Sequence, residues 1–242
     1  MKKHLLIISG LLVLNSCATD PLDLAPVSEI GANGFYTNDE EMELATVAIY
    51  DGLQAIPKIE FAVTEMRSDN SKTKTSEGEW AEFESYTVQA TNQQVGLYWA
   101  ANYNVIFRAN RVLEHLDVIT DVALKDQLEG EAKFARALCH YKLANAYGDV
   151  PMLTQVIGPQ DSSFFSRTPV STVMSFVISD LEDASTLLPS KSNMVFGRAT
   201  KGAAEGLLAK AYLRTGDYSS AEAILSGLIS GSDYALEGSY DQ

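Results

Sequence analysis

The residue with the most informative chemistry is Cys17, a thiol that closes a short apolar run near the start of the chain. Lys2 and Lys3 precede an apolar stretch from residue 5 to residue 14, and Ser16 stands directly before the cysteine. A positive start, a short apolar core and small residues in this order are typical of a cleaved signal peptide. Cleavage before Cys17 would leave its thiol at a new N-terminus, where it can be acylated.

Acylation of Cys17 would anchor an otherwise soluble body to a membrane surface. The apolar run covers only about half of a hydrocarbon core roughly 30 Å thick, so it cannot span a bilayer as a helix. Two or more acyl chains hold a protein on a membrane stably, whereas one binds marginally. We predict a lipoprotein signal peptide over 1–16 and a lipid anchor and tether over 17–36. The alternative is an ordinary secretory signal with a chance cysteine.

Acidic residues dominate the charge of the chain. Its 242 residues include 32 Asp and Glu against 18 Lys and Arg, which gives a formal net charge of −14. Such a chain repels nucleic acid and anionic lipid headgroups, so we predict neither as a ligand. The length suits one large domain or two small ones.

The spacing of the remaining reactive side chains indicates neither a metal site nor a catalytic cysteine. Cys139 is followed directly by His140. Adjacent residues on a helix point about 100° apart, so this pair is poorly placed for joint chelation or catalysis. No set of His, Cys or carboxylates has a zinc-like spacing. We predict no metal and no cofactor, and we expect Cys139 to be a small core residue.

A run of glutamates offers the one set of acids suited to hydrolytic chemistry. A glycosidase holds two carboxylates across a cleft. The candidates are Glu77, Glu79, Glu82 and Glu84. They lie in an acidic stretch that is most simply a solvated surface, and no motif selects a pair. We therefore predict that the chain is not an enzyme.

The segments that must position these residues have the pattern of helices. Apolar residues recur at spacings of three and four, the period of an amphipathic helix. The first helix follows Thr37-Asn38-Asp39-Glu40, which has the form of a capping box, and is expected to end at Pro57. Further helices are expected over about 97–113, 124–147, 169–188, 204–212 and 221–229.

Caps and glycines mark the ends of these helices. Thr168 before Pro169 predicts a helix start with the hydroxyl as its cap, and Thr200 is a second expected cap. Gly148 and Gly216 are expected stops, and each is followed by an Asp. Positions 148 and 216 differ by 68, which is twice the 34-residue period of tetratricopeptide repeats. We predict an all-α fold of tetratricopeptide-like helical repeats with long loops.

Several motifs also follow one another in a fixed order. They include Cys17-x-x-Asp20-x-Leu22-Asp23, Trp99-x-x-x-Tyr103-x-x-Ile106, Glu129-Gly130-Glu131-Ala132-x-Phe134-x-Arg136 and Tyr147-Gly148-Asp149-Val150-Pro151. With these motifs the chain resembles the SusD/RagB family of surface lipoproteins from Bacteroidetes, over essentially its whole length. Members of that family usually continue well beyond this point. We therefore expect 37–242 to be a SusD-like helical domain that is truncated at its C-terminus.

The resemblance implies a lipid-anchored protein of the outer membrane that faces the cell surface. It implies that the protein captures oligosaccharide and delivers it to a SusC-type TonB-dependent transporter, without catalysis. The alternative is a helical-repeat lipoprotein that binds a partner protein and no sugar.

The resemblance also implies that the region between the first two helices supplies part of the ligand site. Aromatic faces stack on pyranose rings, while Asn, Asp and Arg bond the hydroxyls. The predicted glycan-binding residues are Trp80, Tyr86, Arg67, Asp69, Asn70 and Asn92. The alternative is that the aromatic residues here, Phe83 above all, cap the core beneath a long loop.

The net charge favours a neutral or weakly charged glycan, unless Arg67, Lys72 and Lys74 form a local basic patch.

Two polar residues that match the family pattern are expected to have structural roles rather than to bind a ligand. We expect Arg136 to pair with Glu131 or Glu129 near a helix interface. We expect Asn110 to be buried and bonded to neighbouring backbone.

Overall fold

The computed structural model describes residues 34–74, 78–158, 161–231 and 233–235. The chain divides into two compact units, Met1–Thr37 and Asn38–Gln242, and all helices named below belong to the second. The described residues contain helices and no strand, which confirms the predicted all-α fold. The predicted signal peptide, Cys17 and most of the tether lie outside the described residues.

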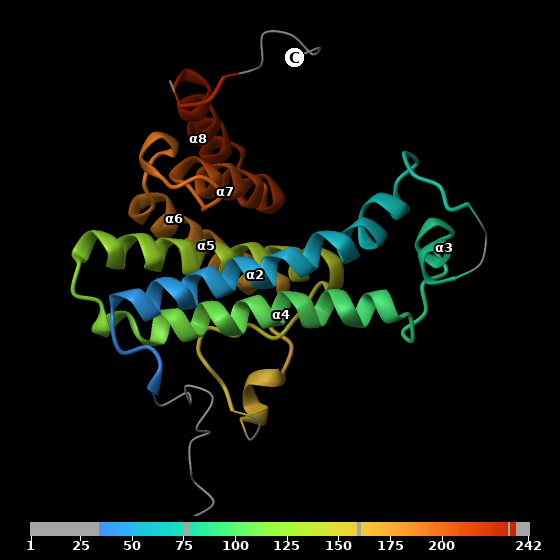
Figure 1. Ribbon diagram of the computed structural model, residues 1–242. Coiled ribbons are helices and arrows are strands. Elements are labelled where there is room, and N and C mark those ends of the chain that lie inside the picture. The colour runs from blue at the N-terminus through green and yellow to red at the C-terminus, as the bar shows by residue number, and fades with distance from the viewer. Residues whose placement is uncertain (1–33, 75–77, 159–160, 232, 236–242) are drawn as a thin grey trace, which may run out of the picture. The chain divides into compact units, whose positions relative to one another are not determined.

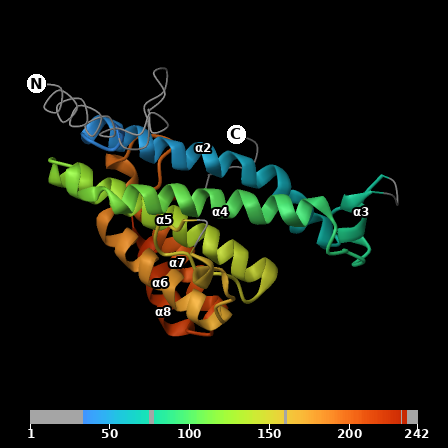
Figure 2. The same cartoon turned by 90° about the horizontal axis from the view of Figure 1, so that it is seen from below.

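Seven helices follow one another in the described part of the chain (Figure 1). They are α2 (Asp39–Val63), α3 (Glu79–Glu84), α4 (Gln93–Glu114), α5 (Val122–Tyr147), α6 (Val170–Leu187), α7 (Lys201–Thr215) and α8 (Tyr218–Ser230). α2, α4 and α5 pack on one another, and α6, α7 and α8 then add in succession on the other side of α5 (Figure 2). This stacking of neighbours in chain order is the architecture of helical repeats.

The first helix differs from its prediction at both ends. Its N-cap is Asn38 rather than Thr37, and the Asn38 side chain accepts a hydrogen bond from the backbone N–H three residues later at 3.0 Å. Pro57 lies inside α2 and does not end it. An interior proline costs a helix about 3 kcal/mol. Buried residues on both sides of it, Ile56 and Ala62, hold the helix together across the proline.

The prediction that the Thr168 hydroxyl caps α6 is wrong. The Thr168 backbone instead forms an isolated antiparallel bridge with Val150, through hydrogen bonds of 2.9 and 3.3 Å. The α6 cap comes from Asp149, whose carboxylate accepts the N–H of Val170 at 2.8 Å. The Gly-Asp sequence after α5 therefore ends one helix and starts the next.

The two predicted glycine stops and the predicted Thr200 cap are confirmed. Gly148 and Gly216 follow α5 and α7 with φ of 74° and 83°, a backbone region that favours glycine. The Thr200 hydroxyl caps α7 by accepting the N–H of Ala203. Cys139 is fully buried in α5, as a core residue should be.

A buried ion pair joins α5 to α6. Arg136 donates from Nε and Nη2 to the two carboxylate oxygens of Asp180, at 2.8 Å each, and the two residues are 7% and 4% exposed. The Arg136 Nη1 also donates to the Asn110 side-chain oxygen at 2.8 Å. The Asn110 amide in turn donates to the Leu153 carbonyl at 3.1 Å, which confirms its predicted role.

The predicted partners of Arg136 are wrong. Side chains pair along a helix at spacings of three or four, and Glu131 and Glu129 lie five and seven positions away from Arg136. Glu131 instead accepts the Tyr50 hydroxyl at 2.6 Å, and Glu129 pairs with Lys133 at 2.7 Å. Arg136 therefore reaches across to the next helix.

Candidate functional site

The predicted glycan-binding residues lie in the segment between α2 and α4, which includes the short helix α3. α3 stands beyond the main helix stack, near one end of α2 and α4 (Figure 1). It begins after Gly78, whose φ of 96° is poorly tolerated by other residues. A six-residue helix is unstable alone, so neighbouring side chains must hold it in place.

Asn92 is the main support of α3. Its side-chain oxygen caps α4 by accepting the N–H of Gln94 at 2.9 Å. Its amide donates to the Glu79 carbonyl at 2.9 Å and to the Glu82 carboxylate at 2.8 Å, both on α3. The residue is 4% exposed. The structure thus places Asn92 beneath the surface, where it fixes the position of α3.

The glutamates of α3 also organise the segment. The Glu79 carboxylate accepts the side-chain amide of Gln94 at 3.0 Å. The Glu84 carboxylate accepts the backbone N–H of Thr73 at 2.7 Å. We expected these carboxylates to be simply solvated. The structure shows that they also form hydrogen bonds within their own loop.

Hydrogen bonds hold two of these carboxylates in the charged form. The bond from the Asn92 amide lowers the pKa of Glu82, and the bonds from Thr73 lower the pKa of Glu84. A glycosidase acid needs the opposite shift. The fourth glutamate of the run, Glu77, lies outside the described residues.

Tyr86 and Arg67 meet at the edge of a hollow, which we call the Tyr86 hollow. The Tyr86 hydroxyl donates to the Arg67 carbonyl at 2.5 Å, and both residues line the hollow together with Phe83, Val88 and Tyr147. The hollow has a volume of about 280 Å³. Tyr86 is 69% exposed as a whole residue, and its backbone has a φ of 57°. Non-glycine residues in this conformation are strained and are enriched at functional sites.

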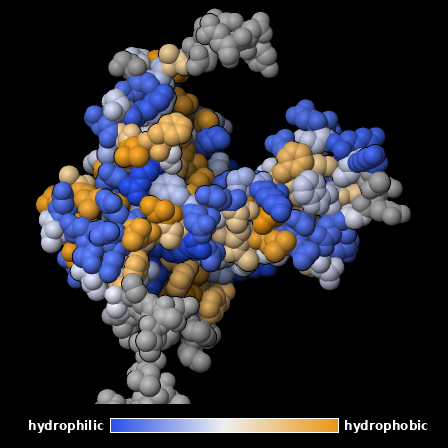
Figure 3. All heavy atoms as spheres, in the orientation of Figure 1, coloured by the Kyte–Doolittle hydropathy of each residue, from blue (hydrophilic) through white to orange (hydrophobic). Residues whose placement is uncertain are grey.

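The remaining predicted residues do not line the Tyr86 hollow. Trp80 is 38% exposed on α3, and its ring centroid lies 5.6 Å from that of Phe61 on α2. Asp69 and Asn70 are exposed in the turn after α2. Phe83 is only 4% exposed and belongs to the core, as the alternative interpretation expected. Hydrophilic residues surround a smaller hydrophobic area at the α3 end of the molecule (Figure 3).

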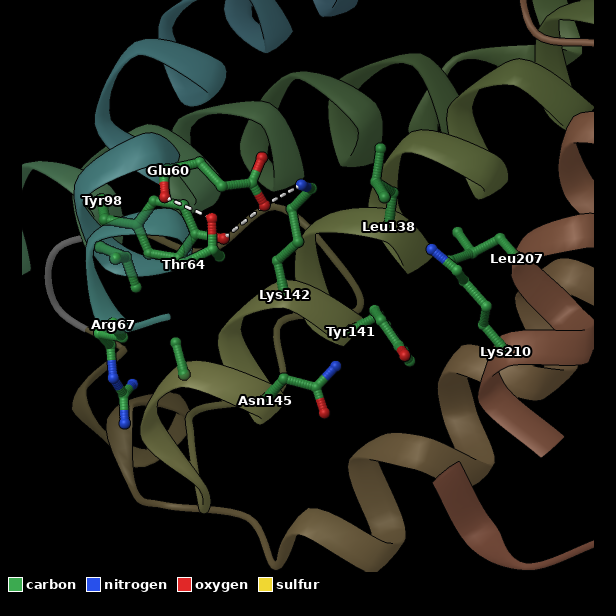
Figure 4. A pocket seen from close by; sticks show the side chains of 12 residues that line it. Glu60, Thr64, Arg67, Tyr98, Leu138, Tyr141, Lys142, Asn145, Leu207 and Lys210 are labelled. Atoms are coloured by element: carbon green, nitrogen blue, oxygen red, sulfur yellow. Dashed lines mark hydrogen bonds and ion pairs between the residues drawn. The ribbon is translucent and has the colours of Figure 1, made fainter. Parts of the chain in front are cut away.

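A second hollow adjoins the first, and we call it the basic hollow. It has a volume of about 290 Å³ and lies between the end of α2, α5 and α7 (Figure 4). Arg67 lines both hollows, whereas Lys142 and Lys210 line only the basic one. The two lysines come from helices far apart in sequence, and no local pattern in the sequence could have indicated that they meet.

The described residues offer little for metal chemistry or membrane spanning. No group of three or more His, Cys, Asp or Glu among them could hold a metal ion. None of the described helices combines the length and apolar character that crossing a bilayer requires.

Comparisons with known proteins agree on one family. A family model described as "SusD-like_3: Starch-binding associating with outer membrane" matches residues 22–213. A SusD-like protein of Bacteroides ovatus is 28% identical over 218 residues, which cover 88% of this chain and 39% of the relative.

Solved structures give the same result. The crystal structure of a SusD-like protein from Bacteroides fragilis matches with a TM-score of 0.75 and 26% identity, over 88% of this chain and 42% of that one. A structure described as a laminarin binding SusD-like protein matches with a TM-score of 0.69 and 28% identity, over 79% and 43%. The chain therefore spans less than half the length of the relatives that it matches.

Proposed function

Because the chain belongs to the SusD-like family of starch-binding proteins that associate with the outer membrane, we propose that it captures oligosaccharide at the cell surface without cleaving it. Beyond the family, the proposal rests on the exposed ring of Tyr86, whose hydroxyl donates to the Arg67 carbonyl at the edge of the Tyr86 hollow.

The Tyr86 ring is suited to stacking on a sugar. Its hydroxyl is engaged by the Arg67 carbonyl, which fixes the orientation of an otherwise exposed side chain. A fixed aromatic ring loses little entropy when a pyranose ring stacks on it. Among the described residues, the Arg67 guanidinium has no carboxylate within ion-pair distance, so its donors are available to sugar hydroxyls.

The neighbouring predicted residues extend this site. Trp80, supported by Phe61, offers a second aromatic surface on α3. Asp69 and Asn70 are exposed in the turn next to Arg67 and supply further polar groups. Asn92 contributes by holding α3 in position rather than by touching the sugar.

Titration of the purified chain with neutral oligosaccharides tests the proposal. We expect isothermal titration calorimetry to detect weak binding of laminarihexaose or maltohexaose, and we expect chromatography to recover the sugar at its original length. Laminarin is a reasonable probe because one relative is described as laminarin binding. Shortened products would indicate an enzyme, and no binding by any neutral oligosaccharide would favour the alternative of a protein partner.

We further propose that Cys17 carries the lipid anchor and that bound oligosaccharide passes to a SusC-type TonB-dependent transporter. The anchor is supported by the short apolar run before Cys17. The outer-membrane location is supported by the description of the family. Cells fed labelled palmitate should label the wild-type chain and not Cys17→Ala; label that persists in the variant would contradict the anchor. Co-purification with a TonB-dependent transporter from native membranes tests the second part.

A further inference from the structure

The basic hollow has an excess of positive charge on a strongly acidic chain. Of its described lining residues only Glu60 is acidic, and Glu60 already forms an ion pair with Lys142 and accepts the Tyr98 hydroxyl at 3.1 Å. Arg67 and Lys210 therefore remain, and neither has a carboxylate within ion-pair distance among the described residues. The net charge of the whole chain is −14, so this hollow is a local exception.

Helix α7 carries a second cation, Arg214, which is bonded to the lining residue Asn145. Lys210 and Arg214 lie four positions apart and so share one face of α7. Arg214 donates to the Asn145 side-chain oxygen at 3.1 Å, which leaves the Asn145 amide as a free donor towards the hollow. Like charges at this spacing destabilise a helix, and no acid among the described residues pairs with either one. A bound anion would remove that repulsion.

The cationic groups are spread along the hollow rather than gathered at one point. Arg67 and Lys210 stand at opposite ends, with Lys142, Tyr141 and Asn145 between them (Figure 4). The volume of about 290 Å³ lies at the lower limit for ligand pockets, which suits one sugar unit of a longer chain. Since Arg67 lines both hollows, a ligand can extend from one into the other.

We propose that the basic hollow binds a carboxylate or sulfate group on an acidic sugar, next to a neutral sugar that stacks on Tyr86. The inference rests on the proposed function and names its substrate class. Lys210 supplies a charge-assisted hydrogen bond to the anionic oxygens, and the Asn145 amide and the Tyr141 hydroxyl add neutral donors. Arg67, at the opposite end of the hollow, donates to the hydroxyls of the neutral sugar that stacks on Tyr86.

The negative charge of the rest of the chain limits the number of acidic groups that a ligand can carry. A densely sulfated polymer would be repelled by the acidic surface beyond the hollow, over distances of about a Debye length of 8–10 Å. The preferred ligand is therefore an oligosaccharide with isolated acidic residues between neutral ones. Nucleic acid, with a charge on every phosphate, is excluded by the same argument.

The replacement Lys210→Gln tests the inference, because Lys210 lies outside the Tyr86 hollow. The probes are a short oligogalacturonate for carboxylate, a singly sulfated oligosaccharide for sulfate, and laminarihexaose as the neutral reference. We expect Lys210→Gln to weaken binding of an acidic probe about fivefold, the effect of one partly exposed charge pair, and to leave laminarihexaose binding unchanged. The probe that shows this loss identifies the acidic group.

The matched control is Lys58→Gln, an exposed lysine of α2 that does not line the basic hollow. It should bind every probe as the wild type does, and both variants should unfold at the wild-type temperature. Raising the salt concentration should weaken binding of acidic probes and spare the neutral one.

Four results would overturn the inference. Equal affinity of the wild type and Lys210→Gln for both acidic probes would remove the basic hollow from the site. If an acidic peptide binds with the same affinity as the best acidic sugar, and if that binding depends on Lys210, the hollow is assigned to a protein ligand instead. If laminarihexaose binds and the acidic probes do not, the inference fails while the proposed function stands. If no sugar binds, both fail.

Discussion

Replacing Arg136 by methionine is expected to lower the free energy of unfolding by about 3–5 kcal/mol, which is the effect of breaking one buried ion pair. The variant leaves the Asp180 carboxylate buried without its two donors from α5. It also removes the donor to the Asn110 side-chain oxygen, so a second polar group loses a partner. Urea denaturation followed by circular dichroism measures the change.

A surface ion pair provides the control. Lys201 and Glu205 lie one turn apart on α7 at 3.7 Å, and Lys201 is half exposed. Lys201→Met should cost no more than about 0.5 kcal/mol. The double variant Arg136→Met with Asp180→Leu should recover much of the lost stability, because no charge then stays buried alone. A cost below about 1 kcal/mol for Arg136→Met would contradict the assignment of this pair as the link between α5 and α6.

Lowering the pH from 7 to 4 is expected to remove about 3 kcal/mol of stability through His140 alone. Burial lowers the pKa of His140 to about 4, from an ordinary value of 6.5. Both ring nitrogens are engaged in the neutral form: Nδ1 donates to the Arg136 carbonyl at 3.0 Å, and Nε2 accepts the Leu153 N–H at 3.3 Å. The unfolded chain therefore binds a proton between these pH values that the folded chain does not, and each pKa unit is worth about 1.4 kcal/mol.

The direction of the pH dependence of stability distinguishes His140 from the buried acids. A lowered histidine pKa gives stability that is present above pH 6.5 and is lost as the pH falls towards 4. Burial raises the pKa of Glu131, and that shift has the opposite dependence on pH. The measurement is therefore the difference in unfolding free energy between the wild type and His140→Gln at several pH values. Equal pH slopes for the two proteins would contradict the account.

Local pattern was sufficient to predict six of the seven helices of the described residues, and it missed the short helix α3. It also failed where contacts distant in sequence decide the outcome. Glycine signals ended two helices as predicted, as Gly148 and Gly216 show. Pro57 did not end α2, because burial on both of its sides outweighs the local cost. Arg136 was predicted to pair within its own helix, whereas its partner Asp180 lies 44 positions away on α6.

The candidate site was predictable by region and not by residue. Aromatic residues in a polar segment, together with the family resemblance, pointed to the segment between α2 and α4, and the structure brings Tyr86 and Arg67 together there. The structural role of Asn92 depends on the position of α3, which has no signal in the sequence. The net charge argued against an anionic ligand, but it averages over the chain and conceals a local cluster such as that around Lys210.

Titration of Tyr86→Ala with laminarihexaose shows whether a sugar binds against the ring of Tyr86. Loss of one aromatic face should cost about 1–3 kcal/mol, or roughly tenfold to a hundredfold in affinity. Tyr86→Phe keeps the ring and loses the hydroxyl that orients it, so its affinity should lie between those of the wild type and Tyr86→Ala. Phe165→Ala removes an exposed ring of the 3-10 helix Ser162–Phe165, which lines neither hollow, and should have no effect. A wild-type affinity for Tyr86→Ala would contradict the account.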